Sequence, residues 1–227
     1  MGNIRTTVAV TLLGSVIAHG VVFTEPSHHY LNPATVCIRL TIADQLSGAA
    51  LNSAKEEAAR IWERHGIVIS WSEPTPQTCR TVVPIVFDAR QLLAQGGKAS
   101  REALGLTVVL GRSQTIYVSA SRAFKMLSET SQFDKAVASQ GERDYRGGVL
   151  IGRVIAHELG HVLLTSMAHS EKGLMRPMFR LRDVLSPDDA TTDLSTSETN
   201  RLVMRFSLLP FEAPAAPPAL ARSEVAK

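Results

Sequence analysis

One stretch constrains the fold more than any other. Residues 149–164, VLIGRVIAHELGHVLL, are mostly apolar and include no proline. Their length and hydrophobic periodicity predict a buried helix that begins after the glycine pair 147–148. Within this run stand His157, Glu158 and His161. Because unpaired polar groups in a core cost free energy on the order of kcal/mol each, the sequence predicts a core helix with a chemical task.

The HELGH motif, residues 157–161, has the spacing of a metal site. On a helix the two histidines lie one turn apart along the axis and about 40° apart around it, so their imidazoles converge. Zinc binds such nitrogens at about 2.0–2.1 Å. Glu158 lies beside this stripe, where its carboxylate reaches a zinc-bound water without being a ligand. The motif therefore predicts one catalytic Zn²⁺, with His157 and His161 as ligands and Glu158 as the general base.

A catalytic zinc ion takes three protein ligands and keeps one position open, so a third ligand is required. His169 follows His161 by eight residues. On an unbroken helix it would lie about 12 Å farther along the axis, too far to share the metal. The helix must therefore end between residues 164 and 168, with residues 165–166 as the natural exit.

Two glutamates are alternatives to His169. Glu171 is close in sequence, and an oxygen ligand on a loop is chemically acceptable. Glu198 is better explained as the capping-box partner of Ser195. Three further residues are candidates to stabilise an oxyanion: Tyr117, Tyr145 and Arg176.

The motif, the nearby third histidine and the GLM of residues 173–175 resemble the zincin metallopeptidases. The arrangement is similar to the metzincin branch, whose pattern is HExxHxxGxxH followed by a methionine turn. HELGH matches position by position, whereas the glycine of that pattern falls on Leu164 and its third histidine on Met167. His169 serves only with two extra residues in the connection. A weaker similarity to exported bacterial peptidases covers Val36 to Arg205 and favours His169.

The resemblance implies an α+β fold. In it, a single zincin-like domain packs a small twisted mixed sheet, with an antiparallel edge strand, on an active-site helix and a backing helix. It also implies that Met175 lies under the metal site and that the edge strand, here residues 115–121, pairs with an extended peptide. The expected function is zinc-dependent endopeptidase activity on protein or peptide substrates, by a monomer. A catalytically inactive zinc-binding or protein-interaction module on the same fold is the alternative, because a fold does not fix a function.

Short strands and helices alternate along the rest of the domain. We expect a polar loop at 141–146, and Pro84 should keep its strand off a central ladder on the amide side. The other expected elements are strands at 35–42, 67–71, 81–87, 104–110 and 115–121, the last at or near a sheet edge, and helices at 47–66, 122–140 and 195–206.

The ends of the chain differ from its middle. Residues 1–24 combine a basic start, an uncharged stretch and a small-residue site, which predicts a signal peptide and export, with a membrane anchor as the second choice. The peptidase domain is expected at 30–209, followed by a disordered tail rich in proline and alanine at 210–227.

Charge and cysteine content narrow the partners and the compartment. The 24 basic and 21 acidic residues leave a net charge of only +3, without a basic run. Nucleic acid is therefore not an expected partner, and a membrane is one only if the N-terminal segment is uncleaved. Cys37 and Cys79 are an even pair, which in an exported protein suggests one disulfide; two buried thiols remain the alternative.

Overall fold

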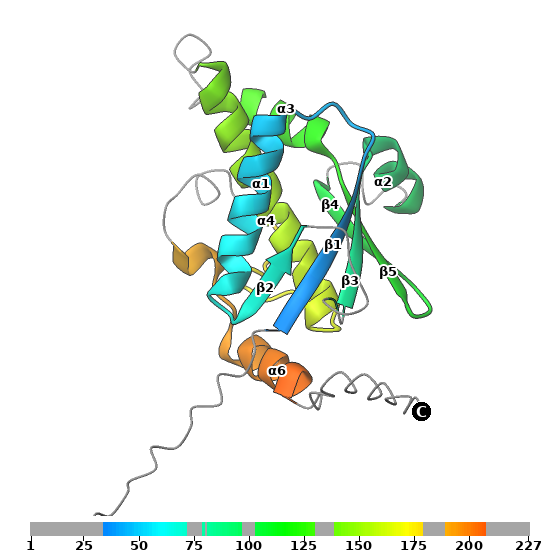
Figure 1. Ribbon diagram of the computed structural model, residues 1–227, viewed down its shortest axis with the longest axis vertical. Coiled ribbons are helices and arrows are strands. Elements are labelled where there is room, and N and C mark those ends of the chain that lie inside the picture. The colour runs from blue at the N-terminus through cyan, green and yellow to red at the C-terminus, as the bar shows by residue number, and fades with distance from the viewer. Residues whose placement is uncertain are drawn as a thin grey trace, which may run out of the picture. The chain divides into compact units, whose positions relative to one another are not determined.

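Five strands form one mixed sheet in the order β2-β1-β3-β5-β4 (Figure 1). The structure, a computed structural model, describes residues 34–71, 79, 81–96, 103–129, 139–178 and 189–207. All neighbouring strands are parallel except β4 and β5. The strands are β1 (Ala34–Ile42), β2 (Ile67–Ser70), β3 (Thr81–Phe87), β4 (Gly105–Leu110) and β5 (Ser113–Val118). This is the predicted α+β fold, a single domain whose mixed sheet has an antiparallel edge strand.

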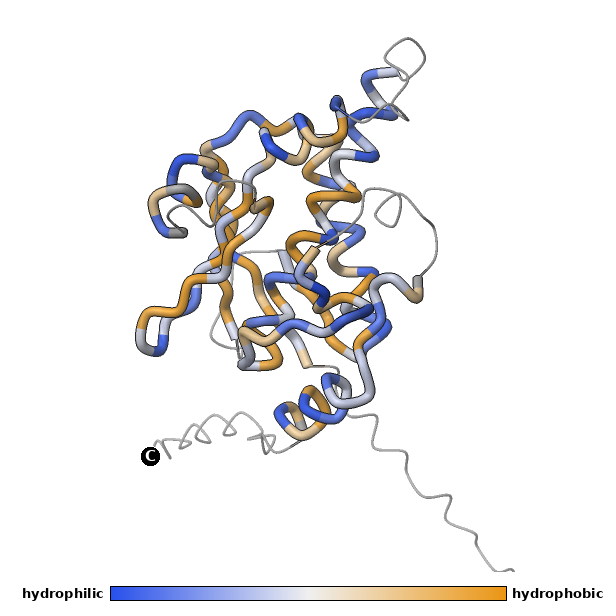
Figure 2. The backbone as a smooth tube through the Cα atoms, turned by 180° about the vertical axis from the view of Figure 1, so that it is seen from behind, coloured by the Kyte–Doolittle hydropathy of each residue, from blue (hydrophilic) through white to orange (hydrophobic). Residues whose placement is uncertain are grey.

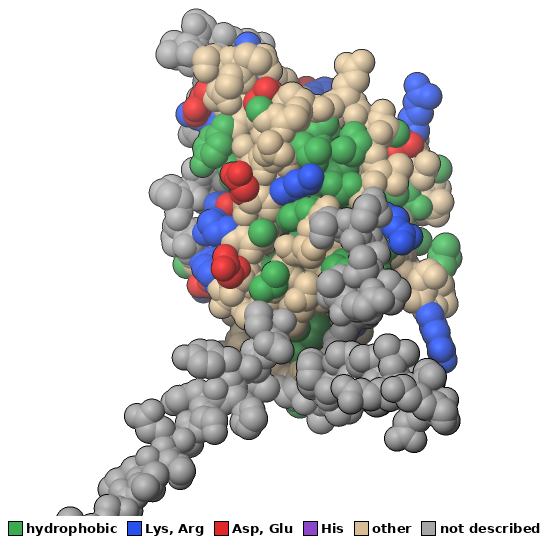
Figure 3. Space-filling view, in the orientation of Figure 1, with side chains coloured by type: hydrophobic (Ala, Val, Ile, Leu, Met, Phe, Trp, Pro, Cys, Tyr) green, Lys and Arg blue, Asp and Glu red, His purple; other side chains and the backbone are tan. Residues whose placement is uncertain are grey.

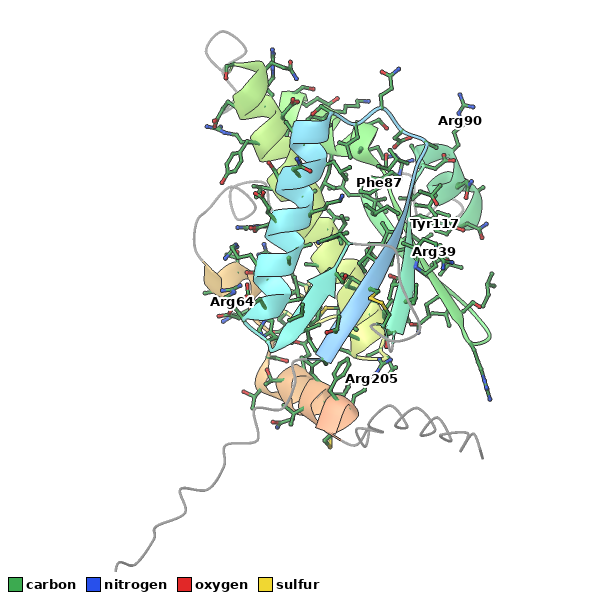
Figure 4. The ribbon with its side chains drawn as sticks, in the orientation of Figure 1. Arg39, Arg64, Phe87, Arg90, Tyr117 and Arg205 are labelled. Atoms are coloured by element: carbon green, nitrogen blue, oxygen red, sulfur yellow. A yellow bond between two sulfur atoms is a disulfide. The ribbon has the colours of Figure 1, made fainter. Side chains whose placement is uncertain are left out.

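Alternation along the strands gives the sheet one buried face. Ile85 and Ile116 are paired on this face and have no exposed surface. The register continues the face to Thr107 of β4, which lies opposite Ile116. Arg39 and Tyr117, both labelled in Figure 4, occupy alternate positions and belong to the other face of the sheet.

The backing helix α1 (Gly48–Glu63) begins at a capped position. The Ser47 hydroxyl accepts a hydrogen bond from the amide of Ala50 at 3.1 Å, which satisfies one of the helix's first amides. Near its other end, the Trp62 indole donates to the carbonyl of Ala156 at 3.1 Å. Because Ala156 lies next to the HELGH motif, this bond ties the backing helix to the predicted active-site helix.

The helix predicted to carry the active site, α4 (Gln140–Leu163), is longer than its sequence predicts. The loop expected at 141–146 is wrong, because these residues form the first turns of α4. The hydroxyl of Ser139 caps them by accepting from Glu142 at 3.2 Å. Glycines 147 and 148 do not start the helix; they allow other helices to pack closely against it. A Cβ on Gly148, for example, would lie 2.6 Å from a carbonyl oxygen of α1.

Shorter helices complete the described domain, namely α2 (Ala89–Gly96), α3 (Ala120–Glu129), the 3₁₀ turn η2 (Asp189–Thr192) and α6 (Thr196–Ser207). The helix expected at 122–140 is replaced by the shorter α3 and the start of α4, with residues 130–138 outside the described part. At α6, Ser195 and Glu198 form the predicted capping box, with the Ser195 amide donating to the Glu198 carboxylate at 2.7 Å.

The strand expected at or near a sheet edge lies next to one. Residues 115–121 contribute to β5, which lies between β3 and β4, so it is not itself available to a further strand. The edge strand on this side is β4, with β2 at the opposite edge, and the hairpin of β4 and β5 extends away from the other strands (Figure 2). Val109 and Leu110 near the turn are 47% and 71% exposed. A hairpin sequence does not show which of its two strands will pair with a third.

Pro84 lies in β3, which has a neighbouring strand on each side, whereas the sequence predicts that the proline keeps its amide side off a central ladder. It stands opposite Arg39 of β1, and the pairing with β5 begins one residue later, at Ile85. β3 therefore has paired neighbours on both sides only after Pro84. The missing amide hydrogen of the proline then removes little hydrogen bonding from the sheet.

Cys37 and Cys79 form a disulfide, with their Cα atoms 5.7 Å apart. The bridge joins β1 to the segment that enters β3, and it decides between the bridged and free-thiol alternatives.

The predicted leader at 1–24 and tail at 210–227 lie outside the described residues. Among the helices that are described, none is long and apolar enough to cross a membrane. On the face shown in Figure 3, lysine and arginine side chains are spread out rather than gathered in one patch.

Candidate metal centre

The C-terminal half of α4 is buried and carries the HELGH motif. His157 and His161 are 6% and 4% exposed, and the apolar residues around them, such as Leu159 and Val162, are at most 1% exposed. The two imidazole centroids lie 4.8 Å apart. One turn of helix has therefore brought both rings to the same point, as the spacing predicts.

The helix ends where a third histidine requires it to. Leu164 is the C-cap, and Thr165 has a positive φ of 48°, a left-handed conformation that non-glycine residues rarely adopt. The amide of Ser166 then donates to the carbonyl of His161 at 3.2 Å. This reversal turns the chain back toward the helix and puts the exit within the predicted interval.

His169 joins the two helix histidines after this turn. Its ring centroid lies 5.3 Å from that of His157 and 4.9 Å from that of His161. The candidate ligand atoms of all three residues lie within 4.8 Å of one another. Nitrogens around a tetrahedral zinc ion are about 3.3 Å apart, from bonds of about 2.0–2.1 Å. His169 is exposed and lies on the loop, unlike the two buried helix histidines, and the three are close enough to reach one ion.

Backbone carbonyls fix how both helix histidines are protonated. His157 Nδ1 lies 2.8 Å from the carbonyl oxygen of Leu174, and His161 Nδ1 lies 2.8 Å from that of Ser166. A carbonyl can only accept, so each Nδ1 carries the hydrogen and donates it. In this tautomer the lone pair is on Nε2, and a partner on Nδ1 of this kind accompanies almost every metal-bound histidine.

Burial also keeps these imidazoles neutral. Desolvation lowers the pKa of His157 to about 4, although its hydrogen bond to the Leu174 carbonyl acts in the opposite direction. Burial lowers the pKa of His161 in the same way. A neutral imidazole is the form that binds a metal, so protons compete weakly for His157 near neutral pH.

Glu158 lies beside the histidines in a different environment. Its side chain is 7% exposed, and its Oε2 accepts a hydrogen bond from the Thr107 hydroxyl at 2.7 Å. Burial raises the pKa of Glu158 to about 7, partly offset by the bonds from Thr107. A carboxyl group with this pKa can take up and release a proton near neutral pH.

Met175 connects the loop after α4 to the helix itself. This side chain is fully buried, and a Cβ on Gly160 of α4 would collide with its sulfur. The Met175 carbonyl accepts from the amide of Ser170, next to His169, at 2.9 Å. Met175 therefore packs against Gly160, in the helix turn that carries the two buried histidines, and its place under a metal ion stays a prediction.

Three of the other sequence candidates, Glu171, Tyr117 and Tyr145, are not part of the histidine cluster, whereas the charge of Glu198 acts on the pKa of His157. Glu171 is exposed and is not part of the histidine cluster. Glu198 caps α6 and accepts from the Ser170 hydroxyl at 2.7 Å. Tyr117 is on the far face of the sheet, and Tyr145 is 58% exposed and twelve residues before His157, about 18 Å along the helix.

Thr107 is the contact that sequence reasoning missed. It stands in the strand sequence GLTVVL, where a threonine among valines is ordinary. Only the register of β4, which turns Thr107 toward α4, reveals its contact with Glu158.

Comparison with protein-family models, with curated proteins and with solved structures gives no match to this chain. The geometry of the three clustered histidines is compatible with a metal site at the end of a buried helix.

Proposed function

We propose that this protein is a zinc-dependent peptidase that hydrolyses peptide bonds. The observation that carries the proposal is a buried carboxylate, Glu158, beside three histidines that can bind one ion. A zinc site made only to support structure usually closes all four positions and uses cysteine. Here the two cysteines are joined to each other, and three histidines leave a fourth position for a water or a substrate.

His157, His161 and His169 would hold the metal, and their chemistry fits zinc. Three neutral imidazoles are a common ligand set of catalytic zinc. Their hydrogen bonds to Leu174 and Ser166 orient the two helix rings before any ion arrives. When bound, zinc activates a water and polarises the carbonyl of the substrate.

Glu158 supplies the proton transfer. Its carboxylate takes a proton from the attacking water as the new carbon–oxygen bond forms. It then gives this proton to the nitrogen of the leaving amine as the carbon–nitrogen bond breaks. In the metal-free protein burial raises the pKa of Glu158 to about 7, so the group exchanges protons readily near neutral pH.

An extended segment of the substrate would pair with β4. This strand is the edge of the sheet, and its contact with Glu158 places it next to the proposed centre. An exposed edge has amides and carbonyls with no strand beside them, so a peptide can add as a further strand. β4 thus takes the role that the sequence had assigned to residues 115–121.

Export is part of the proposal. The Cys37–Cys79 disulfide is typical of proteins that work in oxidising compartments. If residues 1–24 are a cleaved leader, N-terminal sequencing of the mature protein gives a start near Val21. An intact Met1 end in a membrane fraction would instead support the anchor.

The decisive experiment compares the zinc-loaded protein with its Glu158→Gln variant on an unstructured protein substrate. We expect both to hold one zinc per chain, since Glu158 is not a ligand, and the variant to lose several orders of magnitude in turnover. Full activity in the zinc-loaded variant would overturn the mechanism. Zinc binding without any turnover in the wild type would favour an inactive zinc-binding or interaction module.

A further inference from the structure

Thr107 and Glu158 meet across 51 positions of sequence. The Thr107 hydroxyl lies 2.7 Å from Oε2 of the Glu158 carboxylate and 3.1 Å from its backbone carbonyl. Both residues are buried, at 5% and 7% exposure. A hydrogen bond to a carboxylate is among the stronger ones in proteins, so it restricts how the Glu158 side chain can turn.

The strand approaches the helix closely at this point because of Gly105. This glycine lies two positions before Thr107, on the same side of β4. A Cβ on Gly105 would lie 2.8 Å from both Cγ and Oε1 of Glu158, and 2.7 Å from Val154. Gly105 thus makes room for the carboxylate, while Thr107 binds one of its oxygens.

The sheet alone does not explain why residue 107 is a threonine rather than a valine. Valine has nearly the same shape, suits a strand equally well and occupies the next two positions, Val108 and Val109. Burying a hydroxyl costs free energy unless it is hydrogen-bonded. Among the described residues, both partners of the Thr107 hydroxyl belong to Glu158.

We propose that Thr107 is the positioning residue of Glu158, holding Oε2 so that Oε1, beside Gly105, is the oxygen presented for proton transfer. This inference rests on the proposed function, and it extends that function to the edge strand. The strand that offers its edge to the peptide then also sets the orientation of the general base. β4 would then fix both the register of the bound peptide and the position of the Glu158 carboxylate.

The first test needs no activity. A double-mutant cycle in the metal-free protein combines Thr107→Val with Glu158→Leu, and unfolding is followed for both single variants and the pair. A link between the side chains makes the two changes non-additive, by about tenfold in the unfolding equilibrium constant. Additive effects would overturn the inference, whatever the protein catalyses.

The second test measures turnover in zinc-loaded protein. Thr107→Val should lower kcat by about 10- to 100-fold, with KM and zinc content nearly unchanged, because orientation of the base matters only in the chemical step. Thr107→Ser, which keeps the hydroxyl, should recover most of the activity. Thr115→Val is the matched control, since Thr115 lies on the same hairpin but on the opposite face, and its kcat should not change.

The outcomes separate this inference from the proposed function. Coupling in the cycle with an unchanged kcat in Thr107→Val means that the contact only stabilises the fold, and overturns the positioning role. A wild-type protein without turnover overturns the proposed function and the catalytic part of the inference together, while the cycle still decides whether the two side chains are linked.

Discussion

The two halves of α4 differ in what they bury. The first half, residues 140–152, has glycines at 148 and 152 that let the backbone of α1 approach. The second half, residues 153–163, also packs through apolar side chains and Gly160, but it adds three buried polar side chains, His157, Glu158 and His161. The close contact with α1 and the candidate metal ligands therefore lie in different halves of one helix.

This difference teaches how far a local pattern can be interpreted. A histidine or glutamate in an apolar run has few explanations, so the sequence of the second half is enough to predict a metal site there. A glycine has several, because it serves in turns, helix ends and close helix contacts alike. The sequence pattern predicts that a helix begins after glycines 147 and 148, whereas Gly148 lies within α4 where α1 packs closely against it.

The largest effect should come from removing a ligand in the second half. We expect His157→Ala to weaken zinc binding by about a hundredfold to a thousandfold. This follows from about 3–4 kcal/mol per ligand in sites worth about 10–16 kcal/mol in total. Competition with a chelator measures the affinity. The metal-free variant should keep the circular-dichroism spectrum of a folded protein, because the contact between α1 and the first half of α4 is unchanged. Unchanged zinc affinity would remove His157 from the site.

A change in the first half should act on the fold instead. A Cβ on Gly152 would lie 2.7 Å from the carbonyl oxygen of Ala54 and 2.8 Å from Glu57. Gly152→Ala should therefore lower the free energy of unfolding by about 2–3 kcal/mol, measured by denaturant titration of the metal-free protein. Gly141→Ala is the matched control in the same helix. Its Cβ would meet only Ser139, at 3.8 Å, so it should stabilise by about 0.5–1 kcal/mol. Equal effects at both positions would contradict the close helix contact.

The pH dependence of stability should expose the buried carboxyl group of the second half. In the metal-free fold the pKa of Glu158 is about 7, above its ordinary value of 4.5. A raised pKa stabilises the fold below pH 4.5, and this contribution is lost as the pH rises through about 7. Comparison with Glu158→Gln isolates it, because the opposite contribution of His157, lost as the pH falls from 6.5 toward 4, is present in both proteins.

We expect the difference in unfolding free energy between wild type and Glu158→Gln to change by on the order of 2–3 kcal/mol between pH 4.5 and 8. Denaturant titrations at several pH values measure it. A difference that stays flat across this range would mean that Glu158 has an ordinary pKa.

The smallest effect concerns the connection between His169 and α6. The Ser170 hydroxyl donates to Glu198 at 2.7 Å, and Glu198 also receives the amide of Ser195. Ser170→Ala should weaken zinc binding by about tenfold, because the bond to Glu198 anchors the residue next to His169 and so restricts the loop that presents this ligand. Ser195→Ala should instead cost about 1 kcal/mol of stability, through the lost cap, and leave zinc affinity unchanged. A loss of zinc affinity in the second variant alone would reverse these roles.

Much of the site could be predicted from the sequence because it is local. The spacing within residues 157–161 places two rings on one side of a helix, whatever surrounds it. The reach of His169 then requires the helix to end by residue 168, and Leu164 caps it there. The capping box of α6 and the strands at 35–42 and 81–87 are likewise patterns of neighbouring residues.

What the sequence by itself determined, then, is the histidine and glutamate motif, the turn after it and the alternation of strands and helices. Each follows from residues within about one or two turns of one another. Only the tertiary structure decided that β4 is the edge strand, that α4 starts at Gln140 and that Thr107 meets Glu158. These features depend on which strand pairs with which and on how closely two helices approach. Such contacts join residues far apart in the chain, and a local pattern carries no record of them.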